Sequence, residues 1–179
     1  MPSVALLSPG AMATAEPRDP PPYELVNNCV LPRNLRYHIE DDVWARVEGD
    51  RVTLGWTDSS QTVTGSILYV DYLREAGDTL PADKPIATVE AAKWMGVVRA
   101  PFAGTLTAIN EAIEGRHGVV HPVNRSPYHK GWIAEMEPEE PIEKSLEAFL
   151  PIDEAVEAYR EKIDRLDLDA CVHCDSFEI

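Results

Sequence analysis

The chain has 179 residues and carries 16 Lys and Arg against 31 Asp and Glu, a net charge of −15 at neutral pH. A chain of this length can bury a hydrophobic core without help from disulfides or metal ions. The negative charge argues against nucleic acid and anionic membranes as partners, because both are bound by clustered Lys and Arg side chains. No apolar run is long enough to span a bilayer.

The first 36 residues predict a proline-rich, disordered arm followed by a linker. Six of the 15 prolines fall within the first 22 residues, where they exclude a helix or a central strand. No basic residue precedes the short apolar run at residues 4–7, so we expect no signal peptide. Three cysteines are too few for a disulfide framework. These features make a reducing cytoplasm the expected compartment.

Residues 37–136 predict a mainly β domain. Short alternating or apolar segments are separated by turn signals, of which Gly49-Asp50 is typical of a hairpin. Many short strands at close spacing favour a compact barrel or sandwich. The predicted strands are residues 44–47, 52–54, 66–70, 86–89, 96–99, 104–109 and 132–136.

Residues 137–179 predict an acidic, helical carboxyl-terminal extension. They hold 14 acids and four bases, and Pro151 separates a short helix from a second, amphipathic one. We expect the apolar stripe of the second helix to pack on the β domain, and binding to a partner is the alternative. The apolar residues are Leu146, Phe149 and Leu150 in the first helix and Val156, Tyr159, Ile163 and Leu166 in the second.

A single lysine stands between two apolar, extended segments at residues 86–102. The small residues Ala91 and Ala92 permit a tight reversal, which predicts a hairpin with Lys93 at its exposed tip. An isolated lysine at a protruding tip suits enzymatic acylation, because a ligase reaches it without unfolding the protein. The alternative is a solvated lysine that keeps two apolar strands from aggregating.

This hairpin resembles the lipoyl-attachment hairpin of lipoyl carrier proteins, and most closely that of the glycine cleavage system H protein. Glu90 matches an acidic residue three positions before the lysine. Gly77 lies 16 residues before Lys93 and Gly104 lies 11 residues after it, as in that family. The resemblance extends over about residues 37–136 through further motifs in the same order: residues 44–50, residues 54–58 with Gln61, residues 100–104, and Val123-Asn124, Ser126-Pro127-Tyr128 and Gly131-Trp132.

The resemblance implies a mainly β, lipoyl/biotinyl-type barrel-sandwich hybrid with carboxyl-terminal helices. It implies a carrier rather than an enzyme, with lipoic acid in amide linkage to the Nζ of Lys93. Glu90, Gly77 and Gly104 would serve ligase recognition or hairpin geometry. Biotin carriers usually flank their lysine with methionines, whereas Ala92 and Trp94 flank it here. The implied partners are a lipoate–protein ligase or lipoyl transferase and dihydrolipoamide dehydrogenase, with no nucleic acid and no membrane.

Departures from the usual H-protein pattern bear on the pathway. Trp94 follows the lysine where a small residue is common, and His129 stands where glycine is common. Lys93-Trp94 and the Pro101-Phe102 turn resemble the H-like lipoate-binding proteins of bacterial sulfur oxidation, which implies a heterodisulfide-reductase-like complex as partner. The alternatives are a glycine cleavage H protein carrying an aminomethyl group, with the glycine cleavage enzymes as partners, or a structural relative without lipoate. Trp94 would cover the arm or a partner surface, or pack back on the barrel.

Two further patterns involve metal-binding residue types. Cys171 and Cys174 form a C-x-x-C pair that predicts either a redox dithiol exchanging with the lipoyl arm or an inert tail. A zinc site needs four ligands, and only His173 lies near that pair in sequence. His117 and His121 are four residues apart, but Gly118 and Pro122 oppose the helix that would place them on one face. We therefore expect no metal site.

Overall fold

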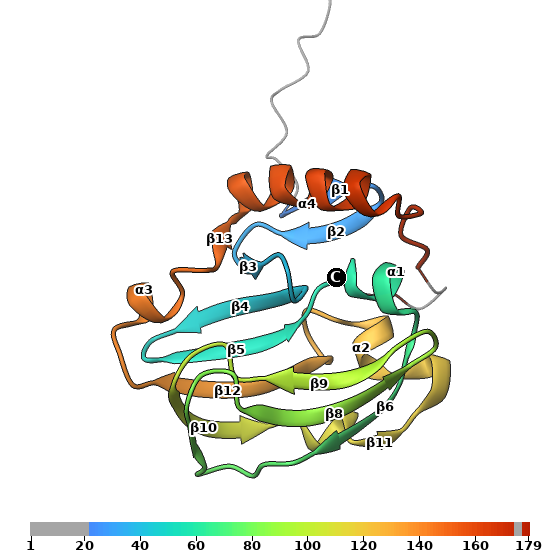
Figure 1. Cartoon of the computed structure of the whole chain (residues 1–179). Coiled ribbons are helices and arrows are strands. Elements are labelled where there is room, and N and C mark those ends of the chain that lie inside the picture. Colours follow the sequence, from blue (N-terminus) through green and yellow to red (C-terminus); the bar gives the residue numbers. More distant parts are fainter. Residues whose placement is uncertain (1–21, 174–176) are drawn as a thin grey trace, which may run out of the picture.

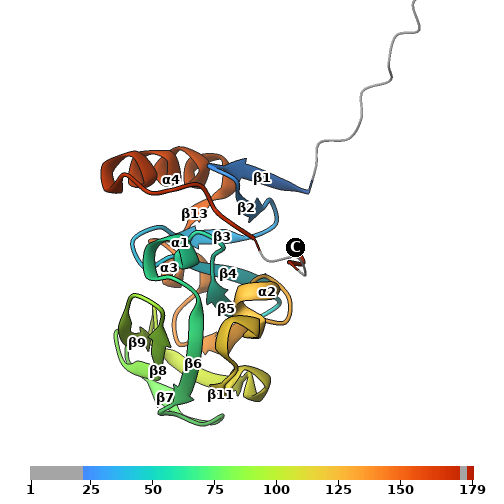
Figure 2. The same ribbon diagram turned by 90° about the vertical axis from the view of Figure 1, so that its right-hand side faces the viewer.

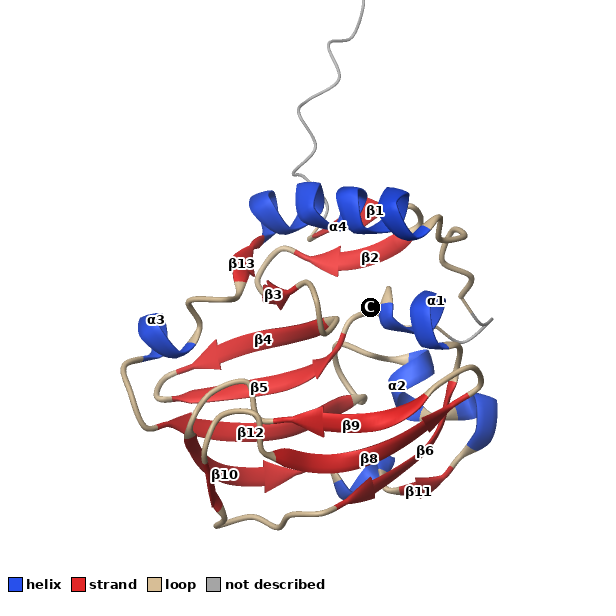
Figure 3. Cartoon of the chain, viewed as in Figure 1, coloured by secondary structure: helices blue, strands red, loops and turns tan. Residues whose placement is uncertain are grey.

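Three antiparallel sheets and one long helix form the described part of the chain, which is residues 22–173 and 177–179 of a computed structural model (Figures 1 and 3). One sheet has seven strands in the order β13-β3-β4-β5-β12-β10-β7, the second has four in the order β11-β6-β8-β9, and β1 pairs with β2 alone. The strands are β1 (Tyr23–Val26), β2 (Cys29–Pro32), β3 (Arg36–His38), β4 (Val43–Glu48), β5 (Arg51–Trp56), β6 (Ile67–Tyr72), β7 (Thr79–Leu80), β8 (Pro85–Ala91), β9 (Met95–Arg99), β10 (Gly104–Ile109), β11 (Gly115–Arg116), β12 (Trp132–Pro138) and β13 (Leu150–Pro151). The helices are α1 (Ser60–Thr64), α2 (Pro122–Arg125), α3 (Ile142–Ser145) and α4 (Ile152–Leu166), with short 3-10 turns at Glu111–Ile113 and Gly118–Val120.

The main core lies between the two larger sheets, which stack on each other below α4 (Figure 1). Register shifts at residues 67–69, 85–87 and 132–134 interrupt the alternation of buried and exposed residues, so that core residues such as Ile67 and Val70 are three positions apart. The core joins Val52, Leu54, Leu106, Ile133 and Met136 of the seven-stranded sheet to Ile67, Val70, Ile86, Val89 and Val98 of the four-stranded sheet. Because both sheets are open, the molecule is a sandwich and not a closed barrel.

The prediction of a mainly β fold is confirmed, and every predicted strand is present within two or three residues of its expected ends. The hairpin of β4 and β5 turns at Gly49, whose φ of +67° favours glycine. In the part of the chain that the structure describes, no helix has the length and apolar character needed to cross a membrane.

The prediction of a linker up to residue 36 is wrong for residues 23–36, which form the β1–β2 hairpin and the start of β3. Asn27 and Asn28 make the two-residue turn, both with positive φ, a conformation that asparagine tolerates better than most residues. Val30 and Leu31 of β2 are buried under α4. The proline-rich arm at residues 1–21 lies outside the described residues.

The carboxyl-terminal segment packs on the rest of the protein, as the sequence predicts. Val156, Tyr159 and Ile163 of α4 are buried in a second cluster, the outer cluster, which also contains Leu31, Tyr37 and Trp44. Figure 2 shows α4 and the β1–β2 hairpin together as a layer on one side of the sheets. The alternative of a free, partner-binding stripe is wrong for these three residues, because the protein's own strands cover them.

Two details of that segment differ from the prediction. The short helix ends at Ser145, and Leu150 instead belongs to β13, which pairs with β3. Leu166 is 46% exposed, because α4 ends there at the left-handed Asp167 (φ 50°). The apolar stripe is therefore one turn shorter than its sequence period indicates.

A buried ion pair fixes α4 to the loop before β4. Lys162 Nζ lies 2.8 Å from Asp42 Oδ2 and also donates to the carbonyl oxygens of Ile39 and Glu40. Burial raises the pKa of Asp42, and the Lys162 charge opposes that shift. Ser59 Oγ donates to the other Asp42 oxygen, so the carboxylate also touches the residue just before α1. This network connects the carboxyl-terminal helix to α1.

Candidate functional site

Lys93 lies in the centre of the tight turn that joins β8 to β9. The backbone N–H of Ala91 donates to the carbonyl oxygen of Trp94 at 2.8 Å, which leaves Ala92 and Lys93 as the two central residues of the turn. The Lys93 side chain is exposed. The predicted hairpin and the position of the lysine at its tip are confirmed.

Two backbone hydrogen bonds fasten this turn to the segment between α1 and β6. The N–H of Ala92 donates to the carbonyl of Ser66, and the N–H of Lys93 donates to the carbonyl of Thr64, both at 2.9 Å. Gly65 lies between those two acceptors with φ of +78°. A Cβ on Gly65 would lie 2.9 Å from the Cβ of Ala92, so glycine permits the close approach of the two segments. The lysine is thus exposed on a rigidly held backbone.

The Trp94 side chain folds back along β9, the strand that begins at the next residue. A Cβ on Gly96 would lie 1.9 Å from the Cζ2 of the Trp94 ring, which shows that the indole rests directly on that glycine. The ring nevertheless stays 41% exposed. Trp94 therefore presents a flat apolar surface beside the lysine while packing on β9.

A cavity of about 290 Å³ opens beside Trp94 and Thr64, close to the Lys93 turn. The larger part of its wall is apolar, and polar side chains from β3 and the following loop, from α1 and from β9 line the rest. Such a lining suits the hydrocarbon chain and disulfide ring of lipoic acid, which expose few hydrogen-bonding groups. The apolar lining residues are Val43, Trp56, Val63, Ile67, Val97 and Val98, and the polar ones include His38, Asp41, Asp42 and Arg99.

Glu90 has an ion-pair partner close to the hairpin tip. Its carboxylate lies 2.6 Å from Arg116 Nη2, and the Arg116 guanidinium lies over the ring of Tyr69 at 5.5 Å. Glu90 is the β8 residue paired with Met95, immediately before the turn. Glu90 was expected either to be recognised by the ligase or to be a solvated surface carboxylate. The structure adds a third role, an ion pair that joins β8 to β11.

Gly77 and Gly104 lie at the far end of the β8–β9 hairpin from Lys93. Gly104 begins β10, where a Cβ would lie 2.4 Å from the carbonyl oxygen of Glu137 on β12. Gly77 has φ of +102°, and its N–H donates to the carbonyl of Leu106 on β10 at 2.7 Å. Both glycines thus serve the geometry of the sheet, and the structure supports that alternative over direct contact with a ligase bound at the lysine.

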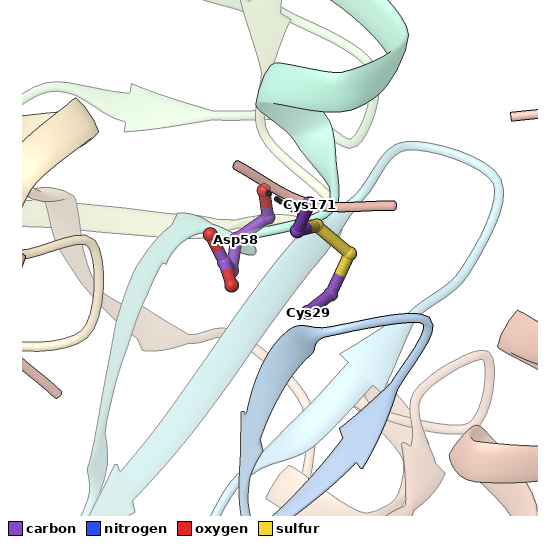
Figure 4. Close-up of side chains that lie close together, drawn as sticks. All are labelled: Cys29, Asp58 and Cys171. Carbon is purple, nitrogen blue, oxygen red and sulfur yellow. Dashed lines mark hydrogen bonds between the residues drawn. A yellow bond between two sulfur atoms is a disulfide. The ribbon is translucent and has the colours of Figure 1, made fainter. Parts of the chain in front are cut away.

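The cysteines pair differently from the C-x-x-C prediction. Cys171 forms a disulfide with Cys29, 142 residues away, with a Cα–Cα distance of 5.0 Å (Figure 4). The expectation that Cys171 pairs with Cys174 or stays a free thiol is therefore wrong. The reason is that the β1–β2 hairpin, predicted as linker, carries Cys29 to the tail. Cys174 lies outside the described residues.

Asp58 and His173 lie beside this disulfide. The sequence pattern indicates His173 only as a neighbour of the C-x-x-C pair, and Asp58 only as part of the motif at residues 54–58. Asp58 Oδ2 accepts from the N–H of Val30 at 2.8 Å and lies 2.6 Å from His173 Nε2. Burial raises the pKa of Asp58, and the hydrogen bonds from Val30 and His173 oppose that shift. Nothing in the spacing of residues 29, 58, 171 and 173 indicates that they meet.

The two histidines of the His117–His121 pair lie side by side on a 3-10 turn, with ring centroids 4.9 Å apart. The predicted absence of a continuous helix here is confirmed. His121 Nδ1 accepts from the N–H of Val123, and burial together with the neighbouring His117 lowers the pKa of His121 to about 4. Among the described residues, no other metal-ligating side chain is grouped with these two.

Replacing Gly65 tests the fit between the turn and α1. Gly65→Ala adds a methyl group against Ala92, whereas Gly115→Ala adds one in open space at a similar φ of +87°. We expect Gly115→Ala to lower the free energy of unfolding by about 1–2 kcal/mol through backbone strain alone. Gly65→Ala should cost about 1 kcal/mol more because of the clash. Urea unfolding of both variants measures the difference, and equal losses would contradict a tight contact at Gly65.

Comparisons with known proteins agree with this arrangement. The family model described as glycine cleavage H-protein matches residues 35–162. The match continues through α3 and most of α4, beyond residue 136 where the resemblance in the motifs ends. A crystal structure of a glycine cleavage system H protein from Mycobacterium marinum has a TM-score of 0.57 and 23% sequence identity, covering 72% of this chain and 98% of that one. That likeness supports the fold.

Curated relatives of this chain are also named as glycine cleavage system H proteins. Glycine cleavage system H protein 2 of Aquifex aeolicus is 34% identical over 146 residues, covering 81% of this chain and 88% of that protein. The probable H protein 2 of Sulfurisphaera tokodaii is 40% identical over 121 residues, 66% of this chain and 79% of that protein. The H protein of Halalkalibacterium halodurans is 36% identical over 132 residues, 74% of this chain and 98% of that protein. The chain belongs to the glycine cleavage H-protein family, whose members carry lipoic acid on a lysine and are carriers rather than catalysts.

Proposed function

We propose that this chain carries lipoic acid in amide linkage to the Nζ of Lys93 and shuttles a covalently bound intermediate between partner enzymes. The observation that carries the proposal is the turn itself: Lys93 is exposed while its backbone N–H and that of Ala92 are fixed to Thr64 and Ser66. A ligase can therefore reach the amine without disturbing the fold. The apolar cavity beside Trp94 would hold the distal part of the group.

The other lysines offer poorer attachment points. Lys162 is buried against Asp42, Lys130 pairs with Glu178 at 2.7 Å, and Lys144 pairs with Glu140 at 2.6 Å. No described residue forms an ion pair with Lys84 or Lys93, and both are exposed. Lys84 precedes β8 at the opposite end of the hairpin, away from the cavity-lining Trp94. Lys84 is therefore the matched control for Lys93.

Lipoic acid supplies, when bound, a cyclic disulfide that takes up a group on reductive opening. The protein's own residues anchor the arm, present it at one fixed point and shelter its end. Tethering raises the effective concentration of the cofactor at any partner that docks beside the hairpin. Met95, which is 78% exposed, and Trp94 form an apolar surface next to Lys93 on which such a partner would rest.

For the pathway, we propose sulfur oxidation with a heterodisulfide-reductase-like complex. The supporting features are Trp94 beside the lysine and the disulfide-bonded tail, which packs against α1 through Thr62. The specific alternative is the aminomethyl carrier of glycine cleavage, which the names of the relatives favour. Three proteins of Aquifex aeolicus among these relatives are numbered 2, 3 and 5, so one organism holds several such carriers and has room for more than one role. Lipoate–protein ligase or lipoyl transferase and dihydrolipoamide dehydrogenase would be partners in either pathway.

Substituting the lysines tests the attachment site. Lys93→Arg keeps the positive charge but removes the primary amine, so we expect complete loss of lipoylation with the same thermal unfolding midpoint as wild type. Lys84→Arg should leave lipoylation unchanged. Intact-mass measurement of both variants from a lipoylating host reports the modification. Lipoate on Lys93→Arg, or its loss from Lys84→Arg alone, would overturn the assignment.

A paired substitution separates the roles of Glu90. Glu90→Gln and Arg116→Gln break the same ion pair from its two sides, and each should change the free energy of unfolding by less than about 1 kcal/mol because the pair is half exposed. If the ligase recognises the carboxylate, only Glu90→Gln slows lipoylation. Equal rates for the two variants, measured by timed mass spectrometry with purified ligase, would show that Glu90 acts only through its ion pair.

The pathway is tested by asking whether the lipoylated chain serves glycine decarboxylase. We expect little or no exchange of labelled bicarbonate into glycine, because Trp94 and the tail change the surface around Lys93 on which that enzyme would dock. The decarboxylase with its own H protein provides the positive control. Exchange at the control rate would refute the sulfur-oxidation proposal and establish the aminomethyl carrier.

A further inference from the structure

Four potential metal ligands meet where the tail crosses the β1–β2 turn. The ligand atoms of Cys29, Asp58 and Cys171 all lie within 4.8 Å of one another, and all three residues are buried. His173 Nε2 lies 2.6 Å from Asp58 Oδ2 at the edge of the group. We call these four residues the tail site. Figure 4 shows Asp58 next to the disulfide, where the dashed line marks the contact between Cys171 Sγ and the main-chain carbonyl oxygen of Asp58.

Contacts other than the disulfide hold Cys171 against the β1–β2 turn, next to Cys29. The N–H of Cys171 donates to the carbonyl of Asn27 at 3.0 Å, and Asn28 Nδ2 donates to the carbonyl of Cys171 at 2.7 Å. Thr62 Oγ1 lies 3.2 Å from Cys171 Sγ. Because these hydrogen bonds do not depend on the S–S bond, the two sulfur atoms would remain neighbours after reduction.

The reduced tail site contains a donor set typical of zinc. Zn²⁺ prefers four ligands from cysteine thiolates, histidine nitrogens and carboxylate oxygens, at about 2.0–2.3 Å. Tetrahedral donor atoms at these bond lengths lie roughly 3.3–3.8 Å apart, so the ligand atoms of Cys29, Asp58 and Cys171, which all lie within 4.8 Å of one another, need only small shifts to bind one ion. Asp58 is buried, and a divalent cation beside its carboxylate would compensate the cost of burying that charge. The chain's net charge of −15 also favours cations.

We propose that reduction of the Cys29–Cys171 disulfide converts the tail site into a Zn²⁺ site formed by Cys29, Cys171, Asp58 and His173. A dithiol reductant gives two electrons and two protons to the disulfide and is itself oxidised to a disulfide. The two new thiols release their protons to solvent as their thiolates bind Zn²⁺. His173 Nε2 then turns from Asp58 to the metal. In the reverse direction a disulfide oxidant takes two electrons from the two thiolates and two protons from solvent, becomes a dithiol, and the re-formed Cys29–Cys171 disulfide releases the ion.

The test uses the full chain with Lys93→Arg, so that no lipoyl thiols compete for metal and the result is independent of the carrier proposal. The protein is prepared oxidised and after reduction with a phosphine, and Zn²⁺ alone is titrated into each under anaerobic conditions. We expect one Zn²⁺ per reduced chain and none per oxidised chain. Zn²⁺ should also raise the thermal unfolding midpoint of the reduced chain only. With Co²⁺ as probe, the reduced chain should show thiolate charge-transfer absorption.

Three variants assign the ligands. Cys29→Ser should weaken Zn²⁺ binding by about a hundredfold or more, and His173→Gln, whose side chain lies at the partly exposed edge, by about tenfold or more. Cys174→Ser is the matched control and should bind like the parent, because Cys174 is not among the proposed ligands. Absence of Zn²⁺ binding to the reduced parent, or undiminished binding by Cys29→Ser, would overturn the proposal. Loss of binding in Cys174→Ser with retention in Cys29→Ser would overturn it equally, by assigning the metal to the C-x-x-C pair.

Discussion

The exposed lysine depends on two backbone hydrogen bonds that hold its turn against the α1–β6 connection. A two-residue turn at the end of a hairpin has few contacts of its own and would otherwise fray. Here the amides of Ala92 and Lys93 are both satisfied by neighbouring carbonyls, and Gly65 lets the two backbones come close enough to form those bonds. The side chain is left free while its Cα is fixed. A carrier needs this combination, because its partners must find the attachment point in one place.

Helix α1 in turn depends on residues from the far end of the sequence. Ser59, just before α1, donates to Asp42, and Asp42 is held by Lys162 of α4. Thr62, on α1 itself, touches the sulfur of Cys171 in the tail. The same five-residue helix therefore contacts the lysine turn through Thr64 and the carboxyl-terminal tail through Thr62. These contacts connect the Cys29–Cys171 disulfide to the Lys93 hairpin through α1. A change in the redox state of the disulfide therefore has a structural route to the hairpin.

The sequence was informative wherever local patterns determine structure. Alternation and turn residues located the strands around Gly49 and Lys93, and the helical period located the buried face of α4. The sequence was not informative where packing between distant segments determines the structure. The β1–β2 strands contain only four residues each, and the burial of Leu31 under α4 stabilises them more than their own composition does. The pairing of Cys29 with Cys171, and the meeting of Asp58 with His173, depend on that hairpin and have no local signature. Only the Asn27-Asn28 pair, which is typical of a turn, indicated the β1–β2 hairpin in the sequence.

The outer cluster has a consequence for how the protein is made. It joins β1 and β2, near the beginning of the chain, to α4, near the end, and the disulfide joins Cys29 of β2 to Cys171. During synthesis the central sheets can pair as they leave the ribosome, whereas Leu31 and Tyr37 lack the cover of α4 until that helix follows. Cys29 likewise has no disulfide partner until almost the whole chain has been synthesised. The nascent protein therefore passes through a stage with an assembled sandwich, an uncovered apolar face and an unpaired thiol, and that stage is where chaperones and thiol oxidants would act on it.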